Sequence, residues 1–318
     1  MKRHTREISL ALAIVVLGGV LAVAAPGFFT PGNLRDLTMT NMPVLIVSLG
    51  MTLIILTGQI DISVGSVFAI CSVIAGVTAK TGAGILASAA VACVVGALLG
   101  AVNGALITKA KIPSIVVTLA TMAALRDGLR WITQGAWVQD LPPDFQAFGL
   151  TQEASQAITA AIAAALAGAM LWGLRNLAAG RAVYATGSNA EGARLAGIEP
   201  ARVVFCVFTL TGALTGVAAM LNAVRFNQIP SNAGIGMEMQ VIAAVIVGGV
   251  SVNGGRGTVA GALLGVVLLG MIGPGLTFLG INAYWERALQ GAIILAAVAI
   301  DALRGRSEKH AGVLAARA

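Results

Sequence analysis

The chain has 318 residues, of which 58% are hydrophobic and 10% are charged, and its mean hydropathy is +0.91. Soluble domains carry about 25% charged residues, so this composition excludes an ordinary soluble protein. The formal net charge of +7 would suit nucleic acid, but the basic residues follow the pattern typical of membrane proteins. We therefore expect a membrane protein built of helices, because lipid offers no partner to unpaired backbone groups.

The apolar runs predict a single all-α membrane domain that covers residues 1–318 and spans the membrane about ten times. Each run is about 16–25 residues long, close to the length that a helix needs to cross the hydrocarbon core. In chain order, the predicted spans cover about residues 8–25, 42–57, 62–79, 84–108, 113–133, 156–174, 201–221, 237–252, 257–273 and 284–303.

The distribution of lysine and arginine predicts the orientation of the chain. If the N-terminus is cytoplasmic and the spans alternate, most of the 20 basic residues fall in cytoplasmic segments, as the positive-inside rule requires. The loop over about 134–155 then lies outside, and it carries Asp140, Asp144 and Glu153 but no basic residue. We therefore expect both termini in the cytoplasm.

A carboxylate stands at the start of the third predicted span. Asp61 is followed there by Ser63 and Ser66. We interpret Asp61 as the N-cap of that helix, where a carboxylate also interacts favourably with the helix dipole. The alternative is a proton relay, which a second buried carboxylate would have to accompany.

Glycines recur at four-residue spacing in two segments, namely Gly96, Gly100 and Gly104 in the first and Gly257, Gly261 and Gly265 in the second. Small residues at this spacing let helix backbones approach closely. The surrounding sequences are also alike, since "GALLGAVNGALI" (96–107) matches "GALLGVVLLGMI" (261–272). These copies lie five spans apart, so they have opposite orientations, and we predict an inverted repeat that relates spans 2–5 to spans 7–10.

Two adjacent charges lie near the outer end of the fifth predicted span, Arg126 and Asp127. Charged side chains inside a membrane span are costly unless they are neutralised. We therefore expect these two side chains to pair with each other.

Neither a metal site nor a disulfide framework is indicated. The cysteines Cys71, Cys93 and Cys206 lie inside apolar runs, and the two histidines lie in the polar ends of the chain. The sequence has no G-x-x-x-x-G-K-[ST] motif, so it lacks the loop that cradles ATP phosphates. Its nearest glycine-rich run, "NGGRGT" (253–258), connects two spans and predicts a tight cytoplasmic hairpin. We expect no catalytic residue, metal or cofactor, and any ATP hydrolysis must occur on a partner.

The stretch over residues 180–203, most of which reads "VYATGSNAEGARLAGIEPARV" (183–203), is polar and lies between the sixth and seventh predicted spans. Ser188 and Glu191 have the S-x-x-E spacing of a capping box. Gly197 can supply the left-handed residue that ends a helix, and Pro200 prevents its continuation. A short helix over about 189–196 is therefore predicted. It is either an ordinary interfacial helix or a docking element for another protein, and its poor apolar face favours docking.

Taken together, several segments resemble the membrane permeases of bacterial ABC sugar importers of the ribose, xylose, rhamnose and autoinducer-2 type. They are "TGQIDISVGSVFAI" (57–70), "NGALITKAKIPSIVVTLATM" (103–122), the polar stretch with its "VYATGSNAEGARLAGI" (183–198), "IPSNAGIGMEMQVIAAVIVGGVSVNGGRGTVAGALLG" (229–265) and "YWERALQGAIILAAVAID" (284–301). The resemblance implies a ten-helix permease of the bacterial inner membrane. It also implies three partners: a second permease, a cytoplasmic ATP-binding protein and a periplasmic sugar-binding protein.

The resemblance also implies roles for particular residues. The polar stretch matches the family's coupling segment, here about 175–202, whose short helix sits in a groove of the ATPase. The implied ATPase-coupling residues are Ser188, Asn189, Glu191, Arg194, Leu195 and Gly197. The candidates for lining a path that passes a neutral sugar are Asn103, Thr118, Met122 and Asn222. For each of these four, a structural hydrogen bond between helices is the competing interpretation.

The segments "GAWVQDLP" (135–142) and "AYWERALQG" (283–291) are most similar to rhamnose and autoinducer-2 permeases. The expected substrate is therefore a deoxysugar such as rhamnose, or autoinducer 2. The second permease is either another copy of this chain or a related chain. The alternative function is a secondary transporter that uses an ion gradient to move a small polar solute, although no ion site accompanies the coupling segment.

Overall fold

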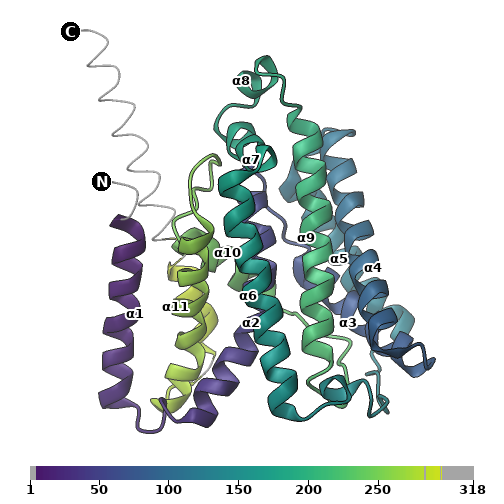
Figure 1. The fold of residues 1–318 in the computed structure, drawn as a ribbon, viewed down its shortest axis with the longest axis vertical. Coiled ribbons are helices and arrows are strands. Elements are labelled where there is room, and N and C mark those ends of the chain that lie inside the picture. The colour runs from purple at the N-terminus through teal and green to yellow at the C-terminus, as the bar shows by residue number, and fades with distance from the viewer. Residues whose placement is uncertain (1–4, 283, 294, 296–318) are drawn as a thin grey trace.

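The computed structural model describes residues 5–282, 284–293 and 295, and Figure 1 shows a bundle of helices. The named helices are α1 (Thr5–Ala24), α2 (Pro31–Leu56), α3 (Val64–Lys80), α4 (Gly84–Thr108), α5 (Ser114–Thr133), the 3₁₀ helix η1 (Gln146–Gly149), α6 (Gln152–Asn176), α7 (Ala178–Ser188), α8 (Ala190–Leu195), α9 (Pro200–Ala223), α10 (Met237–Val247) and α11 (Val259–Phe278). Within the described part of the chain, β-type pairing is limited to one isolated antiparallel bridge between Val138 and Ile229.

Six of these helices are long and apolar enough to cross a membrane: α1, α2, α4, α6, α9 and α11. Two others, α3 and α10, are apolar but shorter. The fifth predicted span is the 20-residue helix α5. Of the tenth predicted span, residues 285–293 are helical, and most of the rest lies outside the described residues. The all-α membrane class is confirmed, whereas the count of ten spans is not.

Several boundaries differ from the sequence prediction, which followed apolar runs, and the start of α2 and the end of α10 are two of them. Helix α2 begins at Pro31, well before the predicted residue 42. Its first turns carry Arg35 and Asp36, which interrupt the hydropathy signal, while a proline at the first position favours helix initiation. Helix α10 ends at Val247, before the predicted end at residue 252. Gly248 and Gly249 directly follow Val247.

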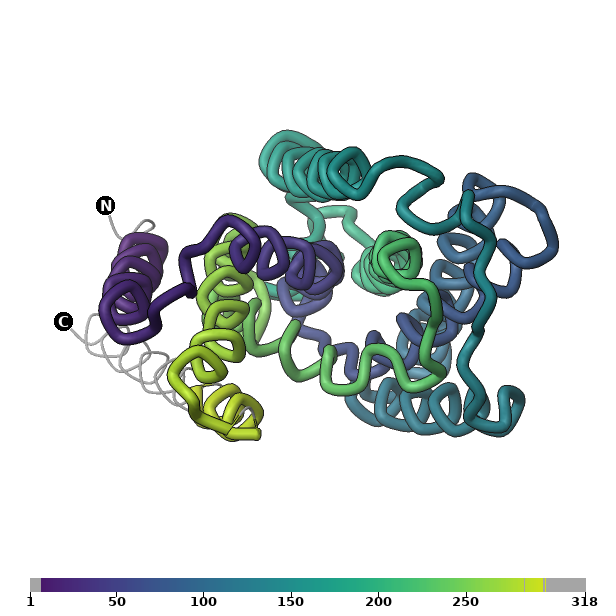
Figure 2. Tube along the Cα trace, turned by 90° about the horizontal axis from the view of Figure 1, so that it is seen from below, coloured from purple at the N-terminus to yellow at the C-terminus, as the bar shows by residue number. Residues whose placement is uncertain are grey.

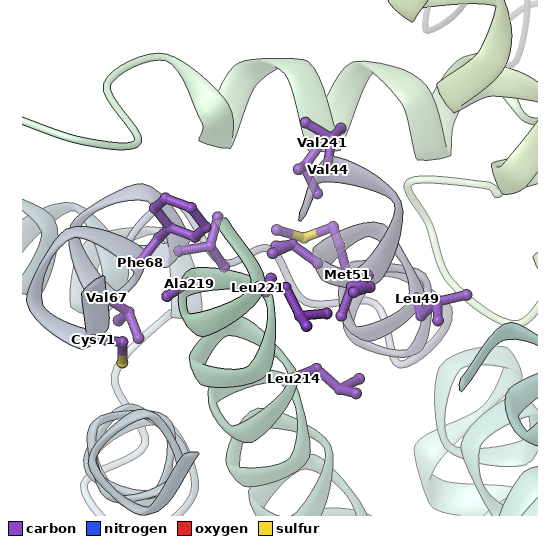
Figure 3. Close-up of a cluster of buried hydrophobic side chains, with 14 of the residues drawn as sticks. Val44, Leu49, Met51, Val67, Phe68, Cys71, Leu214, Ala219, Leu221 and Val241 are labelled. Atoms are coloured by element: carbon purple, nitrogen blue, oxygen red, sulfur yellow. The ribbon is translucent and has the colours of Figure 1, made fainter. Parts of the chain in front are cut away.

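The core lies where α2, α3, α9 and α10 meet, as Figure 3 shows. Met51 of α2, Phe68 of α3, Leu221 of α9 and Val241 of α10 are all buried there. By contrast, α1 lies at the edge of the molecule in Figure 2, next to α11. Because α1 and α6 keep most of their apolar surface exposed, these helices are suited to face lipid.

The first glycine stripe packs α4 against α9. A Cβ atom on Gly96 would overlap the carbonyl oxygen of Gly212, and one on Gly100 would overlap that of Phe208. A Cβ on Gly104 would lie 3.1 Å from the Cα atom of Phe205. The expected close approach of helix backbones is confirmed for this stripe.

The second glycine stripe packs α11 against α10. Cβ atoms on Gly261 and Gly265 would overlap the carbonyl oxygens of Gly248 and Ala244, respectively. Gly257 lies before α11 with a φ of 140°, so it shapes the preceding loop and is not part of the helical stripe.

The helix directions fit the predicted inverted repeat. Contacts that move forward along α4, from Gly96 to Gly104, move backward along α9, from Gly212 to Phe205. The two helices are therefore antiparallel, and α4 ends on the side of the molecule where α9 begins. Helix α11 begins on that side, because the loop before it contacts α7 through the hydrogen bond from Tyr184 to Gly257. The related helices α4 and α11 therefore run in opposite directions. Helix α4 follows the short helix α3, and α11 follows the short helix α10. A non-helical segment precedes each of these two short helices.

Candidate functional site

Helix α8 forms the tip of the molecule, at the top of Figure 1. Its N-cap is Asn189, whose side-chain oxygen accepts hydrogen bonds from the amides of Glu191 (3.0 Å) and Gly192 (2.9 Å). The predicted capping box is wrong, because Ser188 is the last residue of α7. Asn189 follows it in extended conformation, with a φ of −161°, and so provides the cap.

The end of α8 has the geometry that the sequence predicted. Gly197 has a φ of 80°, and its amide donates to the carbonyl of Arg194 at 3.0 Å. The amide of Ile198 donates to the carbonyl of Ala193 at 2.9 Å, which completes a Schellman motif. Pro200 is then the first residue of α9.

The outer surface of α8 is suited to a protein partner. Glu191 and Arg194 are exposed, and Leu195 is 88% exposed, whereas Ala193 faces inward and is buried. An exposed leucine beside charged side chains, on a well-capped helix that projects from the bundle, can insert into a groove of another protein.

Helix α7 connects the tip to two loops of the membrane bundle, and the sequence did not predict it. Gly187 packs directly against the carbonyl oxygen of Leu56, the last residue of α2. The hydroxyl of Tyr184 donates to the carbonyl of Gly257 at 2.9 Å, and that of Ser188 to Gly255 at 3.5 Å. A displacement of α7 and α8 would therefore reach both α2 and the loop before α11.

The run "NGGRGT" forms the tight hairpin that the sequence predicted. The amide of Ser251 donates to the carbonyl of Arg256 at 2.8 Å, and that of Gly254 donates to Ser251 at 2.9 Å. Gly254 and Gly255 have φ values of 80° and 70°, which glycine adopts without strain. This hairpin supplies the backbone that contacts α7.

Beyond α2, the non-helical segment 57–63 leads into α3. Asp61 is not the N-cap of α3, since that position belongs to Ser63. The Asp61 carboxylate instead accepts bonds from the Ser63 amide (2.8 Å) and hydroxyl (2.6 Å). All of these groups are buried, so Asp61 fixes the turn that starts α3.

Three of the four candidate path residues lie around this segment and take part in hydrogen bonds within the bundle. The amide of Asn103 donates to the Ser63 hydroxyl at 2.9 Å. The hydroxyl of Thr118 donates to its own helix at Ser114 (2.8 Å) and is 3.4 Å from the Ile60 carbonyl. The Met122 carbonyl accepts a bond from α3. These contacts agree with the structural interpretation of the three residues.

The fourth candidate, Asn222, lines a cavity of about 420 Å³. The cavity is built from α2, α3, the end of α9, the start of α10 and the loops that follow α5 and α9. The loop that follows α9 runs across the face shown in Figure 2. The cavity is lined by Thr40, Pro43, Phe68, Trp137, Asn222, Phe226, Asn227, Gln228, Pro230, Ala233, Gly234 and Met237. None of these lining residues is charged. Amide side chains both donate and accept hydrogen bonds, so the lining suits a small neutral solute with hydroxyl groups.

The expected pairing of Arg126 with Asp127 is wrong. Asp127 faces Arg130, one turn further along α5, at 3.9 Å, and both side chains are exposed. Arg126 instead donates to the carbonyl of Ala233 at 2.8 Å, and its guanidinium lies beside Gly65 together with the Glu238 carboxylate. Neighbours along a helix point in different directions, which the sequence interpretation overlooked.

Comparison with known proteins places this architecture among transport proteins. The family described as branched-chain amino acid transport system / permease component matches residues 33–298. The autoinducer 2 import system permease protein LsrC of Yersinia pseudotuberculosis serotype O:1b (strain IP 31758) is 34% identical over 94% of this chain and 85% of that protein. The protein of the same name from Photorhabdus laumondii subsp. laumondii is also 34% identical, over 97% of this chain and 93% of its own length. No solved structure matches this chain.

Proposed function

The chain belongs to the permease-component family of branched-chain amino acid transport systems, and we propose that it carries a small neutral sugar-like solute into the cell. The favoured solutes are autoinducer 2 and a deoxysugar such as rhamnose. The observation that carries this proposal is the cavity of about 420 Å³, whose lining sets a few polar side chains among apolar and aromatic ones and carries no charge. Its relatives from Yersinia and Photorhabdus are named as autoinducer 2 permeases, which supports the first of the two solutes.

The chain is a transport subunit of an ATP-binding-cassette importer and not an enzyme. Such a permease works with an ATPase and a substrate-binding protein, which supply the energy and the solute. An ion-gradient-driven secondary transporter does not agree with this family membership.

The tip of the molecule is the proposed contact with the ATPase. The proposed coupling residues are Asn189, Glu191, Arg194 and Leu195 on α8, with Ser188 and Gly197 at its ends. The exposure of Leu195 and the connection from α7 to Leu56 support this assignment. A push on α8 would then be transmitted through α7 to the end of α2 and to the segment 57–63.

The remaining parts of the proposal concern the surroundings of the chain. A second permease, either a copy of this chain or a related chain, would complete the membrane part of the importer in the lipid bilayer. The distribution of basic residues supports a location in the bacterial inner membrane with both termini in the cytoplasm. On this orientation α8 faces the cytoplasm and the cavity faces outward.

The experiment that tests the solute is purification of the importer with its binding protein, followed by mass spectrometry of the bound compound. We expect autoinducer 2 or a monosaccharide. Recovery of leucine, isoleucine or valine, and no sugar-like compound, would overturn the proposed substrate class. A matched uptake assay in proteoliposomes should show competition by the recovered compound and none by leucine.

A further inference from the structure

Two charged side chains meet behind one wall of the cavity. Arg126 extends from α5, and Glu238 lies in the first turn of α10. Both come up against Gly65 in the first turn of α3. A Cβ atom at that glycine would overlap the Oε2 atom of Glu238 and would lie 3.3 Å from the Nη2 atom of Arg126. The glycine therefore makes room for both groups.

Arg126 fastens the segment 231–237, which forms part of the cavity wall, to α5, and Glu238 braces the turn that leads from this segment into α10. Arg126 donates from Nη1 to the carbonyl of Ala233 at 2.8 Å, and Glu238 accepts from the amide of Gly236 at 3.2 Å. Ala233, Gly234 and Met237 line the cavity. Arg126 and Glu238 are not among its lining residues, so they hold the wall from behind.

The wall closes against α3 at the inner end of the cavity. A Cβ on Gly234 would lie 2.7 Å from the carbonyl oxygen of Gly65 and 3.0 Å from the Phe68 ring. Phe68 lines the cavity, and Gly65 lies one turn closer to the start of α3. The two charges therefore lie where the cavity ends and the segment 57–63 begins.

The hydrogen bonding of this cluster is incomplete. The Oε2 atom of Glu238 is buried and has no hydrogen-bond partner among the described residues. A buried carboxylate oxygen without a hydrogen-bond partner is costly, and ionisable groups within the membrane part of a protein commonly serve its function.

We propose that Arg126 and Glu238 are positioning residues for transport, which hold the segment 231–237 against α3 and keep the cavity closed at its inner end. Solute passes when this contact is released. The proposal rests on the role of the chain as a permease and not on the identity of the solute.

The test measures how readily a water-soluble reagent reaches the contact between the segment 231–237 and the start of α3. Ser66 follows Gly65 and is fully buried, so a Ser66→Cys variant in a background without Cys71, Cys93 and Cys206 reports opening. The purified importer, with its ATPase subunits, is treated with a water-soluble maleimide. We expect slow labelling in this parent. Labelling should be faster by about tenfold or more after Arg126→Gln or Glu238→Gln, because each change leaves the opposite charge at Gly65 uncompensated.

Three further variants distinguish release of the contact between the segment 231–237 and α3 from general destabilisation of the bundle. Arg130→Gln removes a guanidinium from the same helix at an exposed site and should label like the parent. Arg126→Lys keeps the positive charge and a donor and should restore most of the slow labelling. The double variant Arg126→Gln with Glu238→Gln should label no faster than either single variant, because both act on one contact.

Glu238→Gln preserves the size of the side chain, so it remains informative if Arg126→Gln does not fold. Labelling of Glu238→Gln at the parent rate would overturn the proposal. So would an Arg130→Gln effect as large as that of Arg126→Gln, or additive effects in the double variant. None of these results depends on which solute is carried, so the solute assignment stands or falls separately.

Discussion

The amide of Gly255 donates a hydrogen bond of 2.8 Å to the carbonyl oxygen of Leu56. Leu56 is the last residue of α2, and Gly255 belongs to the hairpin before α11. Gly187 of α7 packs against the same carbonyl oxygen. Three segments from distant parts of the chain thus meet at one backbone atom, directly below the projecting helix α8.

This meeting point predicts a specific effect of Gly187→Ala. The added Cβ would overlap the Leu56 carbonyl, and overpacking of this kind costs about 1–3 kcal/mol. We expect a lower midpoint of thermal unfolding and a loss of ATP-driven uptake. The matched control is Gly168→Ala on α6, where nothing lies within 4 Å of the new Cβ. Equal behaviour of the two variants would show that α7 does not depend on this contact.

The cap of α8 gives a second prediction. Asn189→Ala removes the acceptor for the amides of Glu191 and Gly192 and should weaken the helix by about 0.5–2 kcal/mol. Hydrogen exchange at these two amides should accelerate. Glu191→Ala should leave the exchange of the Gly192 amide nearly unchanged, because its side chain makes no capping bond to the Ser188 amide in this geometry. If Glu191→Ala accelerated exchange more than Asn189→Ala did, the result would instead support the capping box formed by Ser188 and Glu191.

Local sequence rules predicted much of this region but could not choose between neighbours. Ser188 and Asn189 are both good caps. The choice depends on α7, which continues through Ser188 and leaves Asn189 extended. Helix α7 itself was missed because it is short and polar and packs on loops, so it has no membrane-length apolar run. Gly197 was predicted correctly because a left-handed residue at a helix end is a local requirement.

Long-range contacts account for the other differences. The boundaries of α4, Gly84–Thr108, agree with the prediction because that helix is one uninterrupted apolar run. The sequence interpretation paired Arg126 with its neighbour Asp127. In the structure, Arg126 donates to the carbonyl of Ala233, which lies far along the chain. No periodicity in the sequence signals that contact. A second charged residue in another apolar segment, Glu238, was the available clue.

The glycine stripe gives a third prediction. Gly100→Leu would force α4 away from the Phe208 carbonyl of α9, and we expect a clear loss of folded protein, because overpacking destabilises by about 1–3 kcal/mol or more. Gly168→Leu, on the open surface of α6, is the control and should fold normally. Size-exclusion chromatography after mild detergent extraction measures both yields. A normal yield of Gly100→Leu with altered uptake would mean that this face lines the solute path.

Topology can be tested with two single cysteines in a background without the native three. Asp144→Cys lies in the loop before α6, and Arg194→Cys lies on α8. The distribution of basic residues places these positions on opposite sides of the membrane. A membrane-impermeant maleimide should label the first in intact cells and the second only in inverted vesicles. Labelling of both in intact cells would contradict this orientation.

The central claim is that α8 couples ATP hydrolysis to passage of the solute. The direct measurement is ATP-dependent uptake of labelled autoinducer 2 into proteoliposomes that contain the importer and its binding protein. Wild-type chain is compared with the combined variant Arg194→Glu and Leu195→Asp, which keeps the Asn189 cap of α8. These side chains lie at the projecting tip, so the variant should insert and fold normally. We predict that its uptake falls to background and that it no longer co-purifies with the ATPase. Uptake at the wild-type rate with the ATPase retained would contradict the account.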